Sequence, residues 1–134
     1  MENNTTTLGM FEHAAKTVFQ KWVRLRDEKD PCISCGITYA KAWHGSHYFD
    51  AGTYSGIIFH PINCHKSCDQ CNLHKHGNKP GYRLGLIKKY GEQAVNDLEQ
   101  LAIEKRQYKY SREELIEIAN KYKTKIKNGD FTND

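Results

Sequence analysis

Apolar residues recur every three or four positions near the start of the chain. This spacing marks one face of an amphipathic helix, which we predict over residues 8–28. Proline disfavours helical backbone in the residue before it, so Pro31 requires the helix to end by that point. The polar residues 1–7 are expected to be frayed. The apolar stripe consists of Phe11, Ala15, Val18, Trp22 and Leu25.

The same helical spacing returns after residue 78. It predicts a helical region over 79–127, whose first helix, 79–90, turns Leu84 and Ile87 inward. A second helix is expected over 92–106. Ser111-Arg-Glu-Glu114 is a capping-box pattern that begins the last helix. Residues 128–134 are expected to form a flexible tail after it.

Between these helical regions the pattern indicates strands. Residues 43–49 and 53–59 are rich in aromatic and β-branched side chains, and Asp50-Ala51-Gly52 separates them. This arrangement predicts a β-hairpin. A short helix is expected to follow, from Ser67 to about Gly77. The order strand, strand, helix between flanking helices predicts an α+β fold, with residues 1–134 forming a single domain and 32–78 as its centre.

Composition limits the size of the core. Hydrophobic residues make up 38% and charged residues 27% of the 134 residues, and small cores are commonly stapled by a metal or by disulfides. Residues 1–19 show neither the basic start nor the apolar stretch of a signal peptide, and no segment is apolar enough to span a membrane. We therefore expect a cytoplasmic protein, in which cysteines are reduced.

Two Cys-x-x-Cys pairs predict a structural zinc site. They are Cys32 with Cys35 and Cys68 with Cys71, about thirty residues apart. Four thiolates satisfy tetrahedral Zn²⁺, and two-residue spacers let each pair reach the ion from a tight turn. Gly36 suits the positive φ that such turns often need. The fifth cysteine, Cys64, is then left over, and we interpret it as a buried apolar side chain.

Positive charge is concentrated beside the second cysteine pair. The first fifty residues are neutral, whereas residues 60–90 carry six Lys and Arg against the single acid Asp69. This clustering predicts contact with a polyanion such as DNA. A solvated basic face is the simpler alternative. The predicted DNA-binding residues are Lys66, Lys75, Lys79, Arg83, Lys88 and Lys89.

Phosphodiester hydrolysis needs a base to deprotonate water and a cation to stabilise charge on the phosphate, and residues 47–75 offer side chains for both tasks. His47, near the end of the first strand, is the candidate base. Asn63 would hydrogen-bond backbone across the loop and fix the histidine's geometry. Asn72 offers an oxygen to Mg²⁺ or Mn²⁺, and Lys75 would face phosphate. Taken singly, His47 could be structural, Asn63 could shape a turn and Asn72 could cap the cysteine turn.

Taken in order, these residues resemble the zinc-bound HNH nucleases. The chain is similar, over roughly residues 18–126, to one phage family in particular, the NinG or Rap recombination endonucleases. The motifs that carry this resemblance are Arg24-Leu-Arg-Asp27, Pro31-Cys-Ile-Ser-Cys-Gly36, Trp43-His-Gly-Ser-His-Tyr48, Asn63-Cys-His65, Cys68-Asp-Gln-Cys-Asn72, Gly77-Asn78 and Tyr82-Arg-Leu-Gly-Leu-Ile87.

The resemblance implies a fold and an activity. The fold is a ββα-metal core, and the activity is metal-dependent, structure-specific cleavage of branched DNA, including Holliday junctions and D-loops. It also implies a phage or prophage protein that acts in the host cytoplasm. Resolving a junction takes two nicks, which makes a homodimer plausible.

The chain departs from the HNH pattern at one metal ligand. Many HNH enzymes have Asp directly before the base histidine, where this chain has Ser46. Asp50, His44 or water alone could supply the missing ligand. Four other histidines, His60, His65, His74 and His76, could contact phosphate or enter the zinc shell. The alternative function is a zinc-stabilised DNA-binding module with an inactive HNH site.

Overall fold

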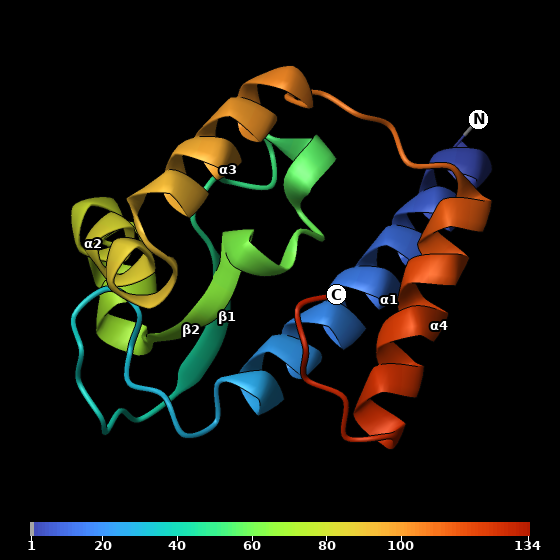
Figure 1. The fold of residues 1–134 in the computed structure, drawn as a ribbon. Coiled ribbons are helices and arrows are strands. Elements are labelled where there is room, and N and C mark those ends of the chain that lie inside the picture. The colour runs from blue at the N-terminus through green and yellow to red at the C-terminus, as the bar shows by residue number, and fades with distance from the viewer. Residues whose placement is uncertain (1) are drawn as a thin grey trace.

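The computed structural model describes residues 2–134, with side chains described from residue 7 onward. It is a mixed α+β fold, as predicted, in which a two-stranded sheet lies between helix α1 (Glu2–Arg26) on one side and α2 (Lys79–Tyr90) on the other (Figure 1). Helix α3 (Glu92–Glu104) packs beside α2, and α4 (Arg112–Lys127) runs alongside α1. No described helix is long and apolar enough to cross a membrane.

The two strands are antiparallel neighbours, β1 (Trp43–His47) and β2 (Cys64–Cys68). Trp43 is paired with Cys68 at one end of the sheet, and His47 with Cys64 at the other. The short π-helix η3 (Gln70–His74) follows β2. It is shorter than the helix predicted from Ser67 to about Gly77, because Ser67 and Cys68 belong to β2.

The predicted position of the second strand was wrong. Residues 53–59 are not a strand; they lie in the connection between β1 and β2, which contains the 3₁₀-helices η1 (Ser55–Ile57) and η2 (Pro61–Asn63). Ile57 and Ile58 are both buried, whereas a half-buried strand would alternate. The aromatic and β-branched residues of this segment fill the core without pairing in the sheet.

Strand β2 was not predicted, because its buried residues are mostly polar and lack the apolar pattern of a strand. All five of its residues are buried, and its backbone is held from outside the sheet. The Lys66 N–H donates to the buried carboxylate of Asp27, and the Lys66 carbonyl accepts from Ile33 N–H. Arg26 pairs with Asp27 and donates to the Cys64 carbonyl, so the end of α1 fixes the edge of the sheet.

Two cores flank the sheet. Between α1 and α4, Phe19 and Trp22 pack on Tyr122 with ring centroids 4.9 Å apart in each pair. Between α2 and α3, Tyr82 and Leu98 belong to the second core. The predicted helical stripes thus lie inward, with one exception in α2. Leu84, expected to point inward, is 68% exposed, because Tyr82 and Leu86 take the buried face.

Both ends of the chain differ from the sequence expectation. Helix α1 begins at Glu2, six residues earlier than predicted, while Met1 lies outside the described residues. The last seven residues lack helix and strand but contact the fold. Trp22 Nε1 donates to the Asp130 carbonyl, and the Phe131 side chain packs on the core of α1 and α4. The predicted flexibility of this tail stays a prediction, against which these contacts argue.

Candidate functional site

The first cysteine pair lies in a turn that its sequence specifies. Gly36 has a φ of +78°, the left-handed conformation predicted for it, and its N–H donates to the Cys32 carbonyl. The Cys32 N–H donates to the Ile37 carbonyl and closes the turn. The second pair begins at the last residue of β2, Cys68, and continues into η3 with Cys71.

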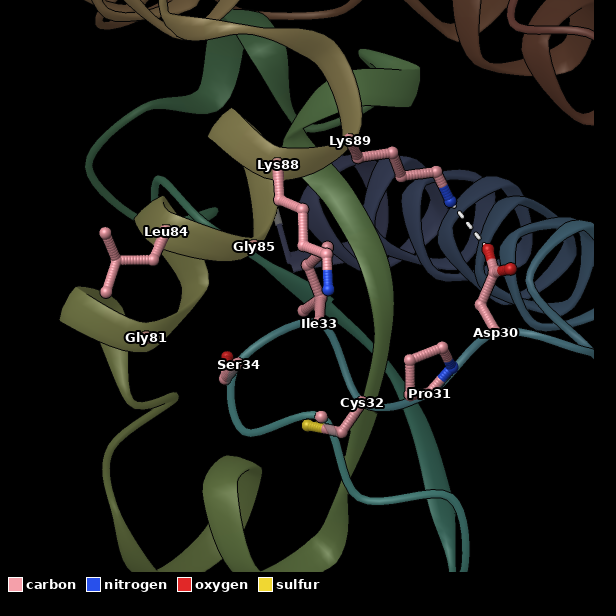
Figure 2. A pocket seen from close by; sticks show the side chains of 11 residues that line it. Asp30, Pro31, Cys32, Ile33, Ser34, Gly81, Leu84, Gly85, Lys88 and Lys89 are labelled. Atoms are coloured by element: carbon pink, nitrogen blue, oxygen red, sulfur yellow. Dashed lines mark hydrogen bonds and ion pairs between the residues drawn. The ribbon is translucent and has the colours of Figure 1, made fainter.

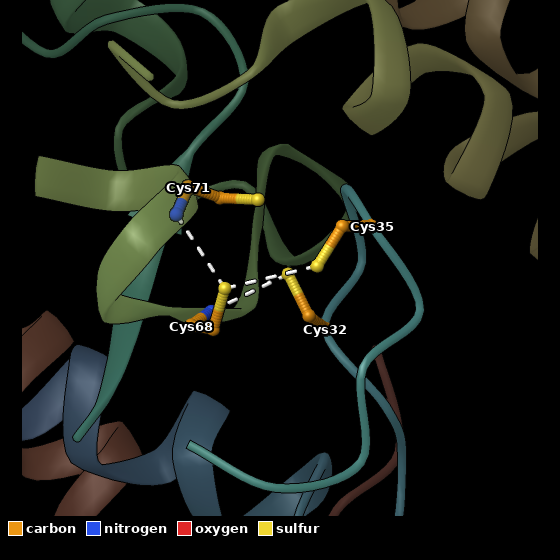
Figure 3. A group of neighbouring side chains, drawn as sticks. All are labelled: Cys32, Cys35, Cys68 and Cys71. Carbon is orange, nitrogen blue, oxygen red and sulfur yellow. Dashed lines mark hydrogen bonds between the residues drawn. The ribbon is translucent and has the colours of Figure 1, made fainter. Parts of the chain in front are cut away.

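All four predicted zinc ligands point toward one another (Figure 3). Their sulfur atoms lie within 4.8 Å of one another, and the Sγ atoms of Cys35 and Cys68 are 3.7 Å apart. Four thiolates at about 2.3 Å from a tetrahedral zinc have sulfurs about 3.8 Å apart. The donor set and its spacing therefore fit Zn²⁺.

The electrostatics of the cluster also favour a cation. The Cys68 N–H donates to Cys32 Sγ at 3.3 Å, and the Cys71 N–H to Cys68 Sγ at 3.4 Å. Burial, together with the neighbouring thiols of Cys35 and Cys68, raises the pKa of the Cys71 thiol to about 12. Four adjacent thiols cannot all ionise unless a cation compensates their charge, and a bound divalent metal supplies it.

The fifth cysteine lies outside this cluster, as predicted. Cys64 is fully buried against Phe19 and Trp22 at the opposite end of the sheet from Cys68. Burial raises the pKa of its thiol to about 12, so Cys64 remains a neutral apolar side chain.

Asn78 contacts the cysteine cluster, a role that was not predicted for it from the sequence. Its side-chain amide donates to Cys71 Sγ at 3.5 Å and to the Ser34 carbonyl at 3.4 Å. The Gly77-Asn78 pair was a usable signal, because both residues adopt positive φ and Asn tolerates that conformation better than most residues.

The candidate base, His47, is the last residue of β1, as predicted. Its Nε2 lies 2.8 Å from the Ile58 carbonyl. A carbonyl only accepts, so Nε2 carries the proton and the lone pair is on Nδ1. Within the described residues His47 Nδ1 makes no hydrogen bond, and it is not among the fully buried atoms without a partner, so it is not completely enclosed. Burial lowers the pKa of His47, and the nearby cations Lys16 and Lys79 lower it further.

Asn63 makes the hydrogen bonds that were expected of it. Its Oδ1 accepts from Phe49 N–H at 2.8 Å, and its Nδ2 donates to the carbonyls of Phe49 and Ile57. Asn63 is fully buried and ties the segment after β1 to the segment that supplies the acceptor of His47. The side chain therefore orders the loop around the candidate base.

The structure does not join the candidate base to the candidate metal ligand. Asn72 lies in η3, beside the cysteine cluster, and no hydrogen bond connects it to His47 among the described residues. The sheet register places His47 at the far end from Cys68, about 13 Å along the strand. Alternation along β1 also directs His47 to the α1 face, together with Gly45, which contacts Gln20.

The two candidates for a second ligand of the catalytic metal, Asp50 and His44, lie in different surroundings. The Asp50 carboxylate accepts from Thr53 N–H at 3.0 Å and is exposed. His44 is paired with Ser67, next to the cysteine cluster, and its buried Nε2 has no partner. Of the His, Cys, Asp and Glu side chains that the structure describes, only the four cysteines form a group of three or more close enough to hold a metal.

The predicted DNA-binding residues divide into three kinds. Lys66 is excluded from this set as a correction: it is 7% exposed, and its ammonium donates to the Glu28 carbonyl and covers the Trp43 ring. Three others form hydrogen bonds or ion pairs within the protein. Lys79 donates to the His47 carbonyl, Arg83 pairs with Glu99, and Lys89 pairs with Asp30.

The remaining two, Lys75 and Lys88, are exposed and form no ion pair or side-chain hydrogen bond within the described part of the chain. Of the predicted set, they are the two whose charges the described part of the fold leaves uncompensated.

The four other histidines lie outside the cysteine cluster. His65 Nε2 lies 2.7 Å from Tyr90 Oη, and burial lowers its pKa well below the ordinary value. His60 Nδ1 accepts from Ile62 N–H and caps η2. His74 and His76 are exposed. None of the four belongs to the group of cysteines that could hold a metal.

Comparison with known proteins identifies the family. The family model described as the bacteriophage lambda NinG protein matches residues 3–131. The proteins named ninG from Escherichia phage 933W and Escherichia phage lambda are each 34% identical over 113 residues, which is 84% of this chain and 55% and 54% of theirs. The chain thus spans about half the length of these relatives. No solved structure matches it significantly. On the family match and the shared identity, the chain belongs to the NinG family.

Proposed function

We propose that this chain is a metal-dependent DNA endonuclease of the HNH type. Its substrates are branched recombination intermediates such as Holliday junctions and D-loops. The observation that supports the proposal is the hydrogen bonding of His47, which ends β1. Its Nε2–H donates to the Ile58 carbonyl, and its Nδ1 has no hydrogen-bond partner among the described residues. A neutral imidazole fixed in one tautomer is what proton abstraction from water requires.

The chain's own residues have separable tasks in this proposal. His47 Nδ1 accepts the proton of the attacking water. Asn63 holds the loop that fixes the opposite nitrogen. Lys79 binds the His47 carbonyl and fixes the end of β1. Lys75, exposed just after η3, contacts phosphate.

Zinc has a structural role here. The four cysteines would hold it, and it would join the turn at residues 32–36 to the end of β2. Since the apolar core is small, binding of this ion contributes directly to the free energy of folding.

The catalytic ion is a second metal, distinct from the structural zinc. Mg²⁺ or Mn²⁺, when bound, would stabilise charge on the phosphate. Asn72 offers an oxygen ligand but lies at the opposite end of the sheet from His47. The exposed Asp50 carboxylate lies near Lys79, whose ammonium binds the His47 carbonyl, so Asp50 is the better second protein ligand for an ion that prefers oxygen. The described residues assemble no complete group for this ion. Mg²⁺ commonly keeps several waters and takes ligands from substrate phosphates, so a site completed by DNA is consistent with this.

The alternative function is a zinc-stabilised DNA-binding module with an inactive HNH site. One observation favours it: His47 and Asn72 lie at opposite ends of the sheet, and the described part of the chain holds no second metal-binding group. Zinc alone would preserve such a fold. The module would bind junctions without cleaving them.

A comparison of substrates separates the two functions. Purified protein is incubated with a labelled four-way junction and with a linear duplex of the same sequence, with and without added Mg²⁺ or Mn²⁺. The nuclease nicks the junction faster than the duplex and only with the added ion. Junction binding without nicking at any metal concentration would favour the inactive module. Sedimentation of the protein–junction complex reports whether two copies act together.

A further inference from the structure

A groove of about 530 Å³ lies between α2 and the loop that carries the first cysteine pair. Pro31 and Ile33 line it on the loop side, and Leu84 and Lys88 on the helix side (Figure 2). It lies beside the zinc cluster, because Cys32 is also among its lining residues. Most of its surface is apolar.

The sequence of α2 produces this groove. Gly81, Leu84, Gly85 and Lys88 are spaced i, i+3, i+4 and i+7, so they share one face of the helix. A Cβ atom at Gly81 would come within 2.1 Å of the Ser34 carbonyl oxygen, and one at Gly85 within 2.0 Å of the Ile33 carbonyl. The two glycines therefore let the helix backbone lie against the loop, while Leu84 and Lys88 stand free beside this contact.

Neither side chain on this face, Leu84 or Lys88, is buried or paired by the residues that the structure describes. Leu84 is 68% exposed although α2 has a buried face available on its other side. Lys88 is exposed and unpaired within the described residues (Figure 2). The rim also carries an acid, Asp30, but its charge is compensated by Lys89 at 2.6 Å. The groove therefore combines apolar walls with a net positive rim.

We propose that this groove receives a single unpaired nucleobase from branched DNA. The base would lie between Leu84 and the loop residues Pro31 and Ile33, and Lys88 would contact an adjacent phosphate. The proposal rests on the proposed function and adds the feature by which a branch is recognised. Apolar side chains commonly hold bases extruded from a duplex, and a Lys at the rim supplies the phosphate contact.

The concave shape selects an unpaired base over an intact duplex. Paired bases are stacked inside the helix and present only their edges in the grooves, which are read by protruding helices or strands. A groove of this volume instead accepts a group of nucleotide size that leaves the stack. Branch points supply such bases at a lower cost than an intact duplex, since their pairing is already interrupted.

A pair of four-way junctions tests the proposal. Both have one unpaired nucleotide next to the branch point, and in the second junction that nucleotide is abasic. Binding is measured without added divalent metal, so that the DNA stays intact. Wild-type protein should bind the base-containing junction about five- to tenfold more tightly than the abasic one.

Two substitutions, each with a matched control, test whether Leu84 contacts the base and Lys88 contacts a phosphate. Leu84→Ala should lower the affinity for the base-containing junction to that for the abasic junction and leave the latter unchanged. Ile103→Ala, a control of similar exposure (67%) on α3, should leave both affinities unchanged. Lys88→Ala should weaken binding to both junctions by the same factor, whereas Lys123→Ala, an exposed control on α4, should not.

The outcomes separate this proposal from the proposed function. Equal affinities of wild type for the two junctions, or a preference that survives in Leu84→Ala, would overturn the nucleobase site while leaving junction binding intact. Leu84→Ala could instead keep the preference for the base-containing junction and change the oligomeric state of the protein. That result would overturn the nucleobase site and assign the groove to a second copy of the chain. Failure to bind either junction would contradict the proposed function itself.

Discussion

At the scale of single residues, His47 connects the sequence to a chemical role. Its Nε2–H is committed to the Ile58 carbonyl, so Nδ1 is the nitrogen available as a base. Burial lowers the pKa of the imidazole, which keeps it neutral to lower pH than a free histidine.

This environment predicts the pH dependence of cleavage. A base with a lowered pKa is active above that pKa and becomes inactive only as the pH falls through it. The nicking rate should therefore stay on its plateau as the pH falls through about 6.5, the ordinary histidine value, and decline only below it. Rates measured from pH 8 to pH 5, with zinc content checked at each point, report this midpoint. A midpoint at or above the ordinary value would contradict a buried His47 base.

Residue identity predicted some contacts well and others poorly. Asn63 was expected to bond the loop backbone, and it does so through three hydrogen bonds. Lys66 was expected at the surface because lysine usually is. Its burial depends on partners distant in sequence, the Glu28 carbonyl and the Trp43 ring, which a local pattern does not contain.

At the scale of elements, helices were predicted more accurately than strands. Helix α2 begins at Lys79 and ends at Tyr90, as expected, and Ser111 and Glu114 form the full capping box ahead of α4. These signals are local. Strand β2 has no apolar alternation, since it is buried on both faces and its polar groups bond to Asp27, Ser46 and Tyr90. Residues 53–59 have a more strand-like sequence than β2, because the apolar side chains of this segment pack in the core.

The cysteine turns allow a matched test of the metal site. Cys68→Ser should release zinc and lower the melting temperature, because it removes one of four converging thiolates. Cys64→Ala should keep one zinc per chain, since that thiol is buried in the core of α1 and α4. Zinc content by elemental analysis and thermal unfolding by circular dichroism check both variants. Loss of zinc from Cys64→Ala, or its retention in Cys68→Ser, would refute the ligand assignment.

At the scale of the whole molecule, the basic segment is only partly available to DNA. Lys66, Lys79, Arg83 and Lys89 are engaged within the fold, which leaves Lys75 and Lys88 exposed and unpaired among the described residues. Composition predicted where positive charge concentrates along the chain. Composition could not predict which of these cations would form ion pairs or hydrogen bonds within the fold.

Salt dependence of DNA binding distinguishes these cations. Lys75→Ala should weaken junction binding and reduce the slope of log affinity against log salt by about 0.9, the value for one lost phosphate contact. Arg83→Ala should change the slope less, because its guanidinium pairs with Glu99. Binding titrations across a salt series measure both. Equal slopes for wild type and Lys75→Ala would assign that lysine to solubility alone.

The most direct test of the central claim is nicking of a labelled four-way junction by His47→Ala. The variant should lose on the order of a hundred- to ten-thousand-fold in rate, the usual cost of removing a general base. Added Mg²⁺ or Mn²⁺ should not restore it, and zinc content and junction affinity should stay close to wild type. Cleavage by folded, zinc-loaded His47→Ala at the wild-type rate would contradict the assignment of His47 as the base and with it the HNH mechanism.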